Sequence, residues 1–149
     1  MGRTGHRTPE QGPKAAEARI RAAGLRPTRQ RRALAALLFE QDTGPDRHVT
    51  AEALHAEATS AGAAVSLATV YNTLHQFTAA GLLREVVVDA GPSYFDTNTS
   101  DHHHLYDEDT GEIADLSASR IRVSGIPRPR PGAEVARVDV VVRVRSRRS

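Results

Sequence analysis

The sequence predicts an α+β fold in which helices fill most of the first half of the chain and short strands fill most of the rest. Apolar residues recur at helical spacing from Ser66 to Ala80, behind a serine that can cap a helix. Two β-rich runs within residues 82–96 are separated by a Gly-Pro turn, which is typical of a hairpin. Val138, Val140, Val142 and Val144 share one side of the last run and charged residues hold most of the other, the period of a strand with one apolar face.

Four helices are predicted from their start and stop signals. They cover about residues 14–23, 29–40, 51–61 and 67–80. Thr28, Thr50 and Ser66 precede the last three and can accept hydrogen bonds from the free N–H groups there. Residues 1–13 mix glycine, proline and charge without periodicity and are predicted to be a disordered tail.

The fourth helix combines an apolar face with a polar face that carries almost no charge. The apolar face is predicted to hold Leu67, Val70, Leu74 and Phe77, and the polar face Thr69, Asn72, Thr73 and Gln76. Uncharged donors and acceptors on an exposed helix suit base edges in the major groove. Helices followed by a hairpin give the order of a winged helix-turn-helix, so residues 14–96 are predicted to be a DNA-binding domain.

A second, small domain is predicted over residues 101–149, after a hinge of small polar residues at 97–100. HHLYDEDTGEIADL reads as two strands about a turn at 109–111, and the proline-rich IPRPRPG suits neither helix nor central strand. The domain is expected to be α/β or mostly β. The last strand, VARVDVVVRVR, has an apolar face that so small a domain cannot cover, which predicts a homodimer paired across a two-fold axis.

Charge and composition narrow the function. The net charge is only +2, but arginines crowd residues 19–32 while acids gather between 89 and 115. Basic clusters suit phosphate, and an acidic stretch with histidines suits a cation, although either cluster alone could be a solvated face. The absence of cysteine excludes disulfides and thiolate zinc. No apolar run of about 18 residues and no signal peptide is present, so we expect a cytoplasmic protein without a membrane partner.

Five segments in order resemble the ferric uptake regulator family. They are GLRPTRQRRALAALLF, HVTAEALHAEA, VSLATVYNTLHQFTAAGLL, YFDTN and HHHLYDEDTGEIADL. Within that family, the HHH triplet and the closing VDVVVRVR are most similar to the iron response regulators, several of which sense haem. The resemblance implies a DNA-binding transcription regulator, a repressor of iron or haem homeostasis genes, with a manganese or zinc sensor as the alternative.

The resemblance also implies a set of DNA contacts. Tyr71 would touch thymine methyls, and Ser66 and Thr69 would touch phosphate or bases. Asn72 stands where the family typically has arginine, which favours adenine there. Arg26 would enter the narrow minor groove of an A·T-rich operator in double-stranded DNA. Arg29, Arg31 and Arg32 would neutralise phosphates. The plainer alternatives are a half-buried tyrosine and ordinary surface arginines.

His102 and His104 are two residues apart and lie on one face of an extended chain, while His103 points away. To these the resemblance adds His48 from the first domain, Asp115 and, as a candidate, Asp96. This nitrogen and oxygen set could take Fe²⁺, Mn²⁺ or Zn²⁺ and would hold the two domains at one angle.

Three alternatives to this metal site remain open for these residues. Haem on His102, His103 or His104 competes with the metal, and three exposed histidines without a ligand is the plain alternative. A metal-dependent hydrolase lacks an evident general base, so we do not expect an enzyme. Asp107 and Thr110 replace the cysteines of the family's structural zinc site, which excludes zinc of that kind.

Overall fold

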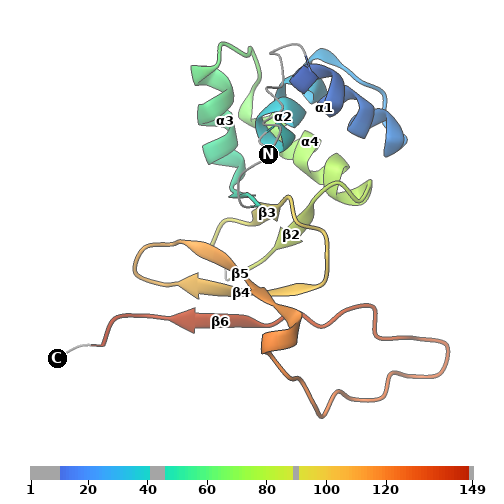
Figure 1. Ribbon diagram of the computed structural model, residues 1–149, viewed down its shortest axis with the longest axis vertical. Coiled ribbons are helices and arrows are strands. Elements are labelled where there is room, and N and C mark those ends of the chain that lie inside the picture. The colour runs from blue at the N-terminus through green and yellow to red at the C-terminus, as the bar shows by residue number, and fades with distance from the viewer. Residues whose placement is uncertain (1–10, 41–45, 89–90, 148–149) are drawn as a thin grey trace, which may run out of the picture. The chain divides into compact units, whose positions relative to one another are not determined.

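The computed structural model describes residues 11–40, 46–88 and 91–147, with side chains from Lys14 onward. The chain divides into two compact units, residues 1–99 and 100–149, with the boundary inside the segment predicted as a hinge. The elements in chain order (Figure 1) are α1 Gln11–Ala22, α2 Arg29–Phe39, β1 His48–Val49, α3 Ala51–Ser60, α4 Leu67–Ala79, β2 Arg84–Val86, β3 Tyr94–Asp96, β4 His102–Asp107, β5 Ile113–Ser117, a short 3-10 helix Ala118–Arg120, and β6 Val141–Val144.

The three predicted helix caps are in place. Thr28, Thr50 and Ser66 accept hydrogen bonds from the backbone N–H three residues later, over 3.2, 3.1 and 3.1 Å. Helix α1 begins at Gln11, so the prediction of a disordered tail to residue 13 was wrong for its last three residues. Pro13 does not prevent this start, because the first turn of a helix needs no backbone N–H donors. Residues 1–10 lie outside the described part.

The first unit packs its helices around one apolar core. Fully buried members are Ile20, Leu34, Leu54, Val70, Leu74, Phe77 and Phe95. A three-stranded antiparallel sheet, ordered β1-β3-β2, adjoins the helices and supplies Phe95 from its middle strand. The predicted hairpin is confirmed as β2 and β3, with the turn at residues 89–90 outside the described part. The unit has the predicted winged helix-turn-helix arrangement.

Two residues of α4 depart from the predicted faces. Thr73 is 4% exposed, although the sequence placed it on the open polar face, and Leu67 is 36% exposed, although it was placed in the core. The buried stripe is Val70, Thr73, Leu74 and Phe77, which follows the i, i+3, i+4, i+7 spacing. Position on the helix therefore decided burial, and polarity misled the prediction. Leu67 is the first helical residue, at the end of the stripe.

The second unit is mostly β, with strands ordered β5-β4-β6. Strands β4 and β5 pair antiparallel about the predicted turn, where Gly111 has φ 74°. The carboxylate of Asp107 accepts the backbone N–H groups of Asp109 and Thr110 over 2.9 and 3.2 Å, which closes this turn. Strand β6 runs parallel to β4 along its other edge.

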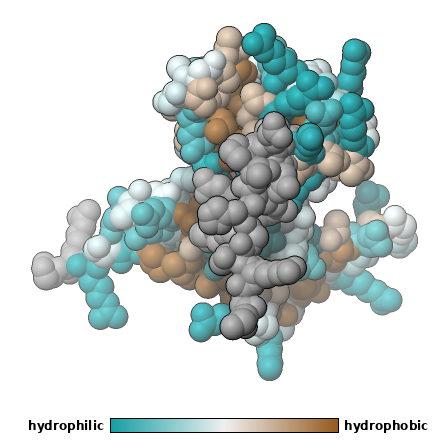
Figure 2. Space-filling view, turned by 45° about the horizontal axis from the view of Figure 1, so that its top comes forward, coloured by the Kyte–Doolittle hydropathy of each residue, from teal (hydrophilic) through white to brown (hydrophobic). Residues whose placement is uncertain are grey.

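The last strand is shorter than predicted. It covers only Val141–Val144, opposite His104–Asp107 of β4, and residues 121–140 form neither helix nor strand. Alternation predicted a strand from 135, but strand structure needs a paired neighbour, and the chain pairs with only four of the six residues of β4. Val142 and Val144 stay 37% exposed, and Figure 2 shows hydrophobic surface between hydrophilic side chains on this unit. The pairing with a second copy stays a prediction. None of the described helices is long and apolar enough to cross a bilayer.

Candidate nucleic-acid interface and metal ligands

The outer face of α4 presents neutral polar groups. Asn72 and Gln76 are exposed, and Thr69 is half-buried at the start of the helix. The hydroxyl of Ser66 is committed to the cap, since it accepts the Thr69 N–H at 3.1 Å and donates to the Thr69 hydroxyl at 2.9 Å. Thr69 therefore keeps its own hydroxyl hydrogen for another acceptor, whereas Ser66 has none left to donate.

Tyr71 is held at both ends. Its hydroxyl donates to the Glu52 carboxylate of α3 over 2.5 Å, and its ring stacks on His75 with centroids 6.4 Å apart. The hydrogen bond lowers the pKa of Glu52 and raises the pKa of Tyr71, because it stabilises the carboxylate and the neutral phenol. Tyr71 could be predicted from the sequence, whereas its partner Glu52, 19 residues earlier, could not. The only sequence feature of Glu52 is its place in the first turn of a helix, where an acid is common because it interacts favourably with the helix dipole.

The arginines beside α4 differ in their partners. Arg31 donates to the Gln76 side chain at 2.9 Å and to the Arg26 carbonyl at 2.7 Å, which ties the segment before α2 to α4. Arg32 forms an ion pair with Glu17 at 3.2 Å. The exposed side chains of Arg26 and Arg29 have no hydrogen bond or ion pair with any described residue. Those two guanidinium groups are thus the ones available to phosphates.

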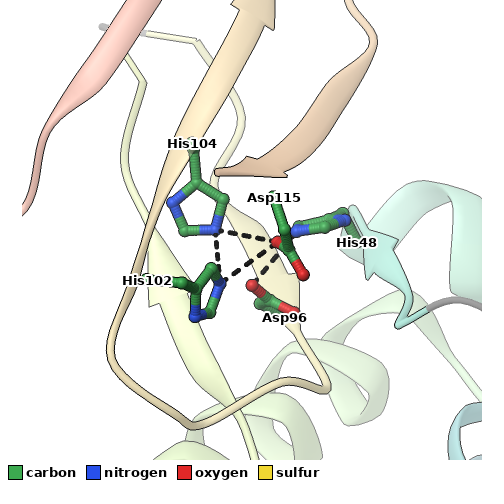
Figure 3. A group of neighbouring side chains, drawn as sticks. All are labelled: His48, Asp96, His102, His104 and Asp115. Atoms are coloured by element: carbon green, nitrogen blue, oxygen red, sulfur yellow. Dashed lines mark hydrogen bonds and ion pairs between the residues drawn. The ribbon is translucent and has the colours of Figure 1, made fainter. Parts of the chain in front are cut away.

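The sheet of the first unit joins a histidine to an acid. Strand pairing sets His48 opposite Asp96, and His48 Nε2 lies 3.1 Å from Asp96 Oδ2 (Figure 3). Both side chains are buried, at 8% and 0% exposed. The other Asp96 oxygen accepts the Asn98 N–H at 2.8 Å. A buried carboxylate needs such partners, and this one directs its second oxygen at an imidazole nitrogen.

In the second unit, two histidines and an acid converge. His102 and His104 lie on one face of β4, with their Nε2 atoms 3.0 Å apart (Figure 3). Asp115 of β5 is the register partner of His104, and its Oδ1 lies 3.1 Å from His102 Nε2 and 3.5 Å from His104 Nε2. Three potential ligand atoms therefore surround one point.

The spacing and chemistry of these three atoms fit a transition metal ion. Two ligand atoms ~2.1 Å from one cation lie ~3.0 Å apart at a right angle and ~3.4 Å apart at a tetrahedral angle. His102 Nδ1 is 2.6 Å from the Ser100 carbonyl, an acceptor, so Nδ1 carries the hydrogen and the Nε2 lone pair points inward. Such a second bond commonly orients a metal-binding imidazole.

His103 stands apart from this set. It is 8% exposed, and its Nδ1 accepts the Val140 N–H over 3.1 Å, next to the bond from His104 N–H to the Val140 carbonyl. The imidazole thus completes the backbone pairing where the chain enters β6. Because this Nδ1 is an acceptor, the neutral ring carries its hydrogen on Nε2.

Comparisons with known proteins place this arrangement among characterised relatives. The model of the Ferric uptake regulator family matches residues 22–140. The ferric uptake regulation protein of Pseudomonas aeruginosa is 36% identical over 132 residues, which cover 87% of this chain and 96% of that protein. A peroxide-responsive repressor of Staphylococcus aureus is 35% identical over 99 residues, 66% of this chain and 64% of that protein.

Solved structures agree with the sequence matches. The Pseudomonas aeruginosa ferric uptake regulator with manganese superposes with a TM-score of 0.66 at 30% identity, over 89% of this chain and 98% of that chain. The Vibrio cholerae regulator superposes equally well, at 0.66, but at 23% identity, over 87% of this chain and 98% of that chain, so it supports the fold alone.

Proposed function

Because the chain belongs to the ferric uptake regulator family, whose members are metal-responsive transcription regulators and not enzymes, we propose that it is a repressor of iron or haem homeostasis genes. A divalent transition metal would control its binding to operator DNA. The observation that carries the proposal is the exposed, uncharged polar face of α4 behind a capped start. A regulator that binds chromosomal DNA must be in the same compartment as that DNA, so we propose that the protein is cytoplasmic.

On DNA, α4 would lie in the major groove of an A·T-rich operator. Asn72 is exposed at its centre and suits the paired donor and acceptor of adenine. Thr69 supplies a hydroxyl donor for a phosphate, and Ser66 acts mainly by fixing Thr69. Arg26 would enter the minor groove and Arg29 would contact the backbone. Residues 101–149 would join two copies into a homodimer, so that two α4 helices meet two half-sites.

The metal would bind at His102, His104 and Asp115, three ligands that leave a coordination sphere unfilled. His48 and Asp96 form a second, two-ligand set in the first unit. We propose that one Fe²⁺, Mn²⁺ or Zn²⁺ ion takes both sets, across the hinge at 97–100. Binding would then hold the two units at one angle and set the spacing between the two α4 helices of the dimer. The manganese in the Pseudomonas aeruginosa structure supports a cation of this class.

Haem is the second candidate ligand, on His102, His103 or His104. Axial imidazole suits haem iron, but His103 would need to turn its free Nε2 outward while Nδ1 holds Val140. Haem and metal would therefore compete for His102 and His104. A response to peroxide is a further candidate, since one relative carries that name.

The test is a titration of the metal-free protein with Fe²⁺, Mn²⁺, Zn²⁺ and haem while its binding to DNA is followed by fluorescence anisotropy. The DNA is a duplex enriched from a random pool by the protein with metal. His102→Ala with His104→Ala should abolish the metal response without loss of the fold, measured by circular dichroism. His103→Ala, its neighbour on the other face, should keep the metal response.

Three outcomes would overturn parts of the proposal. An unchanged response in the His102 and His104 variant removes the proposed metal site. Loss of a haem response in His103→Ala, together with an unchanged metal response in the His102 and His104 variant, would assign haem, not metal, to the triplet. If the protein enriches no duplex from the random pool, the proposal that it is a sequence-specific DNA-binding regulator fails. Peroxide added to the Fe²⁺ form, with the Zn²⁺ form as control, tests the remaining candidate.

A further inference from the structure

The phenol of Tyr71 has already committed its only hydrogen. Its hydroxyl donates to Glu52 Oε1 at 2.5 Å, which joins the first turn of α3 to α4. A tyrosine in this state can still accept a hydrogen bond through its oxygen and can present its ring edge, but it has nothing to donate. Its partner keeps a negative charge beside it.

We propose that Glu52 is a positioning residue that determines what Tyr71 reads on DNA: by holding the phenol hydrogen, it directs Tyr71 to base edges and away from phosphates. The proposal rests on the DNA-binding function proposed above and adds to it a residue outside the reading helix.

The chemistry of the two kinds of DNA surface gives the reason. Phosphate oxygens are acceptors and carry negative charge, so a tyrosine without a free hydrogen gains nothing from them, and the Glu52 carboxylate is repelled. Major-groove edges offer thymine methyls, which suit the ring, and amino groups of adenine and cytosine, which suit the phenol oxygen. The pair therefore favours bases and disfavours sequence-independent backbone contact. Thr69, whose hydroxyl hydrogen is uncommitted, has the opposite preference.

Both anchors of the phenol are themselves fixed. Glu52 lies in the first turn of α3, between the Thr50 cap and the fully buried Leu54, so its backbone is fixed, and the hydrogen bond to Tyr71 selects the rotamer of its exposed side chain. On the other side, the His75 ring stacks on Tyr71 and meets the buried Phe95 edge-on, with centroids 5.6 Å apart. The Tyr71 ring, which is half-buried against the core, is thus held in one orientation, which lowers the entropy lost on binding.

The experiment compares Glu52→Ala, Glu52→Gln and Tyr71→Phe with wild type. Glu40→Ala is the matched control, because it removes one exposed carboxylate from the end of α2. Each protein, with metal, is titrated against the enriched duplex, the same duplex with single thymines replaced by uracil, and a scrambled duplex. Uracil lacks only the methyl group, so it isolates the contact to the ring.

Glu52→Ala should lower the ratio of specific to nonspecific affinity by roughly fivefold or more, with a gain in nonspecific binding, because the phenol can then donate to phosphates. The loss of affinity that Glu52→Ala shows when thymine is replaced by uracil (the uracil penalty) should be smaller than in wild type. Glu52→Gln, whose amide oxygen can still accept the phenol hydrogen, should keep the uracil penalty. In a Tyr71→Phe background, Glu52→Ala should do no more than Glu40→Ala does.

A second readout follows the contact itself. The ultraviolet absorbance of tyrosinate during a pH titration, with Tyr71→Phe subtracted, reports Tyr71 alone. Glu52→Ala should bring the pKa of Tyr71 down towards its ordinary value, because the hydrogen bond that raises it is gone. An unchanged midpoint would overturn the proposal, as would a shifted midpoint with unchanged specificity. If wild type itself shows no specific duplex, the proposed function fails; if wild type is specific and Glu52→Ala equals Glu40→Ala, only this inference fails.

Discussion

Replacing Arg26 and Arg29 together by alanine should flatten the salt dependence of DNA binding. These two guanidinium groups have no hydrogen bond or ion pair with any described residue, and Arg31 ties the Arg26 backbone to Gln76 of α4. Arg29 is the first residue of α2, and alanine is a good helix former, so we expect the fold to tolerate the change.

The magnitude follows from counterion release. Each neutralised phosphate contributes ~0.9 to the slope of log affinity against log salt. Arg29 on the backbone and Arg26 between the phosphates that line the minor groove count as one each, which gives ~1.8 per chain and ~3.6 for two copies on one operator. A fourfold rise in salt should then narrow the affinity gap between wild type and variant by ~12-fold per chain, or ~150-fold per dimer. The assay is fluorescence anisotropy with a labelled duplex over that salt range.

The control replaces Arg21 and Arg32, which both pair with Glu17, over 3.0 and 3.2 Å. It removes the same charge, but from guanidinium groups whose field a carboxylate already compensates, so the slope should change much less. Equal flattening in the two variants would refute the reasoning, because the slope would then report net charge and not contacts.

Three further outcomes are expected. Phe77→Ala should lower the free energy of unfolding by about 3–5 kcal/mol in urea denaturation, since the ring is fully buried, while Phe77→Leu should cost clearly less; equal costs would contradict close packing there. Asp115→Asn should weaken metal binding at least ~10-fold by calorimetry, whereas Glu112→Gln in the adjacent exposed turn should not, and similar losses would point to general charge. The backbone N–H of Ser146 lowers the pKa of Asp109, so that contact stabilises the fold above the ordinary aspartate range and is lost as pH falls through the lowered pKa. The protection factor of the Ser146 amide, which compares its hydrogen exchange with that of an unstructured amide at the same pH, should fall on acidification, and a constant protection factor would argue against the contact.

Local signals account for most of what the sequence could predict. An N-cap side chain hydrogen-bonds a backbone N–H only three residues away. The starts of α2, α3 and α4 could therefore be predicted from Thr28, Thr50 and Ser66 alone. The same holds for the β4–β5 turn, which Asp107 and Gly111 close within six residues. Prediction was weaker where a residue's neighbour lies far along the chain.

The strand β1 illustrates that limit. Two residues have no periodicity, and His48 pairs with Asp96 only because β3 lies between β1 and β2. The residues adjacent in sequence to His48 or to Asp96 give no indication that these two side chains are neighbours. Resemblance to a family could name both, whereas residue chemistry could find only His102 and His104, whose alternation is local. The Glu52–Tyr71 contact, which joins two helices, was missed for the same reason.

The arginines of residues 26–32 show that the number of basic residues in a segment does not identify which of them can contact DNA. Arg26, Arg29, Arg31 and Arg32 are alike in the sequence, and all were expected to meet DNA. In the fold, Arg31 and Arg32 are held by Gln76 and Glu17, while Arg26 and Arg29 are open. A carboxylate partner already compensates part of a cation's charge, as Glu17 does for Arg32, so the net benefit of an added phosphate contact is smaller. Recognition therefore depends on which donors the fold leaves uncommitted, and this applies to the hydroxyl hydrogens of Thr69 and Tyr71 as much as to the arginines.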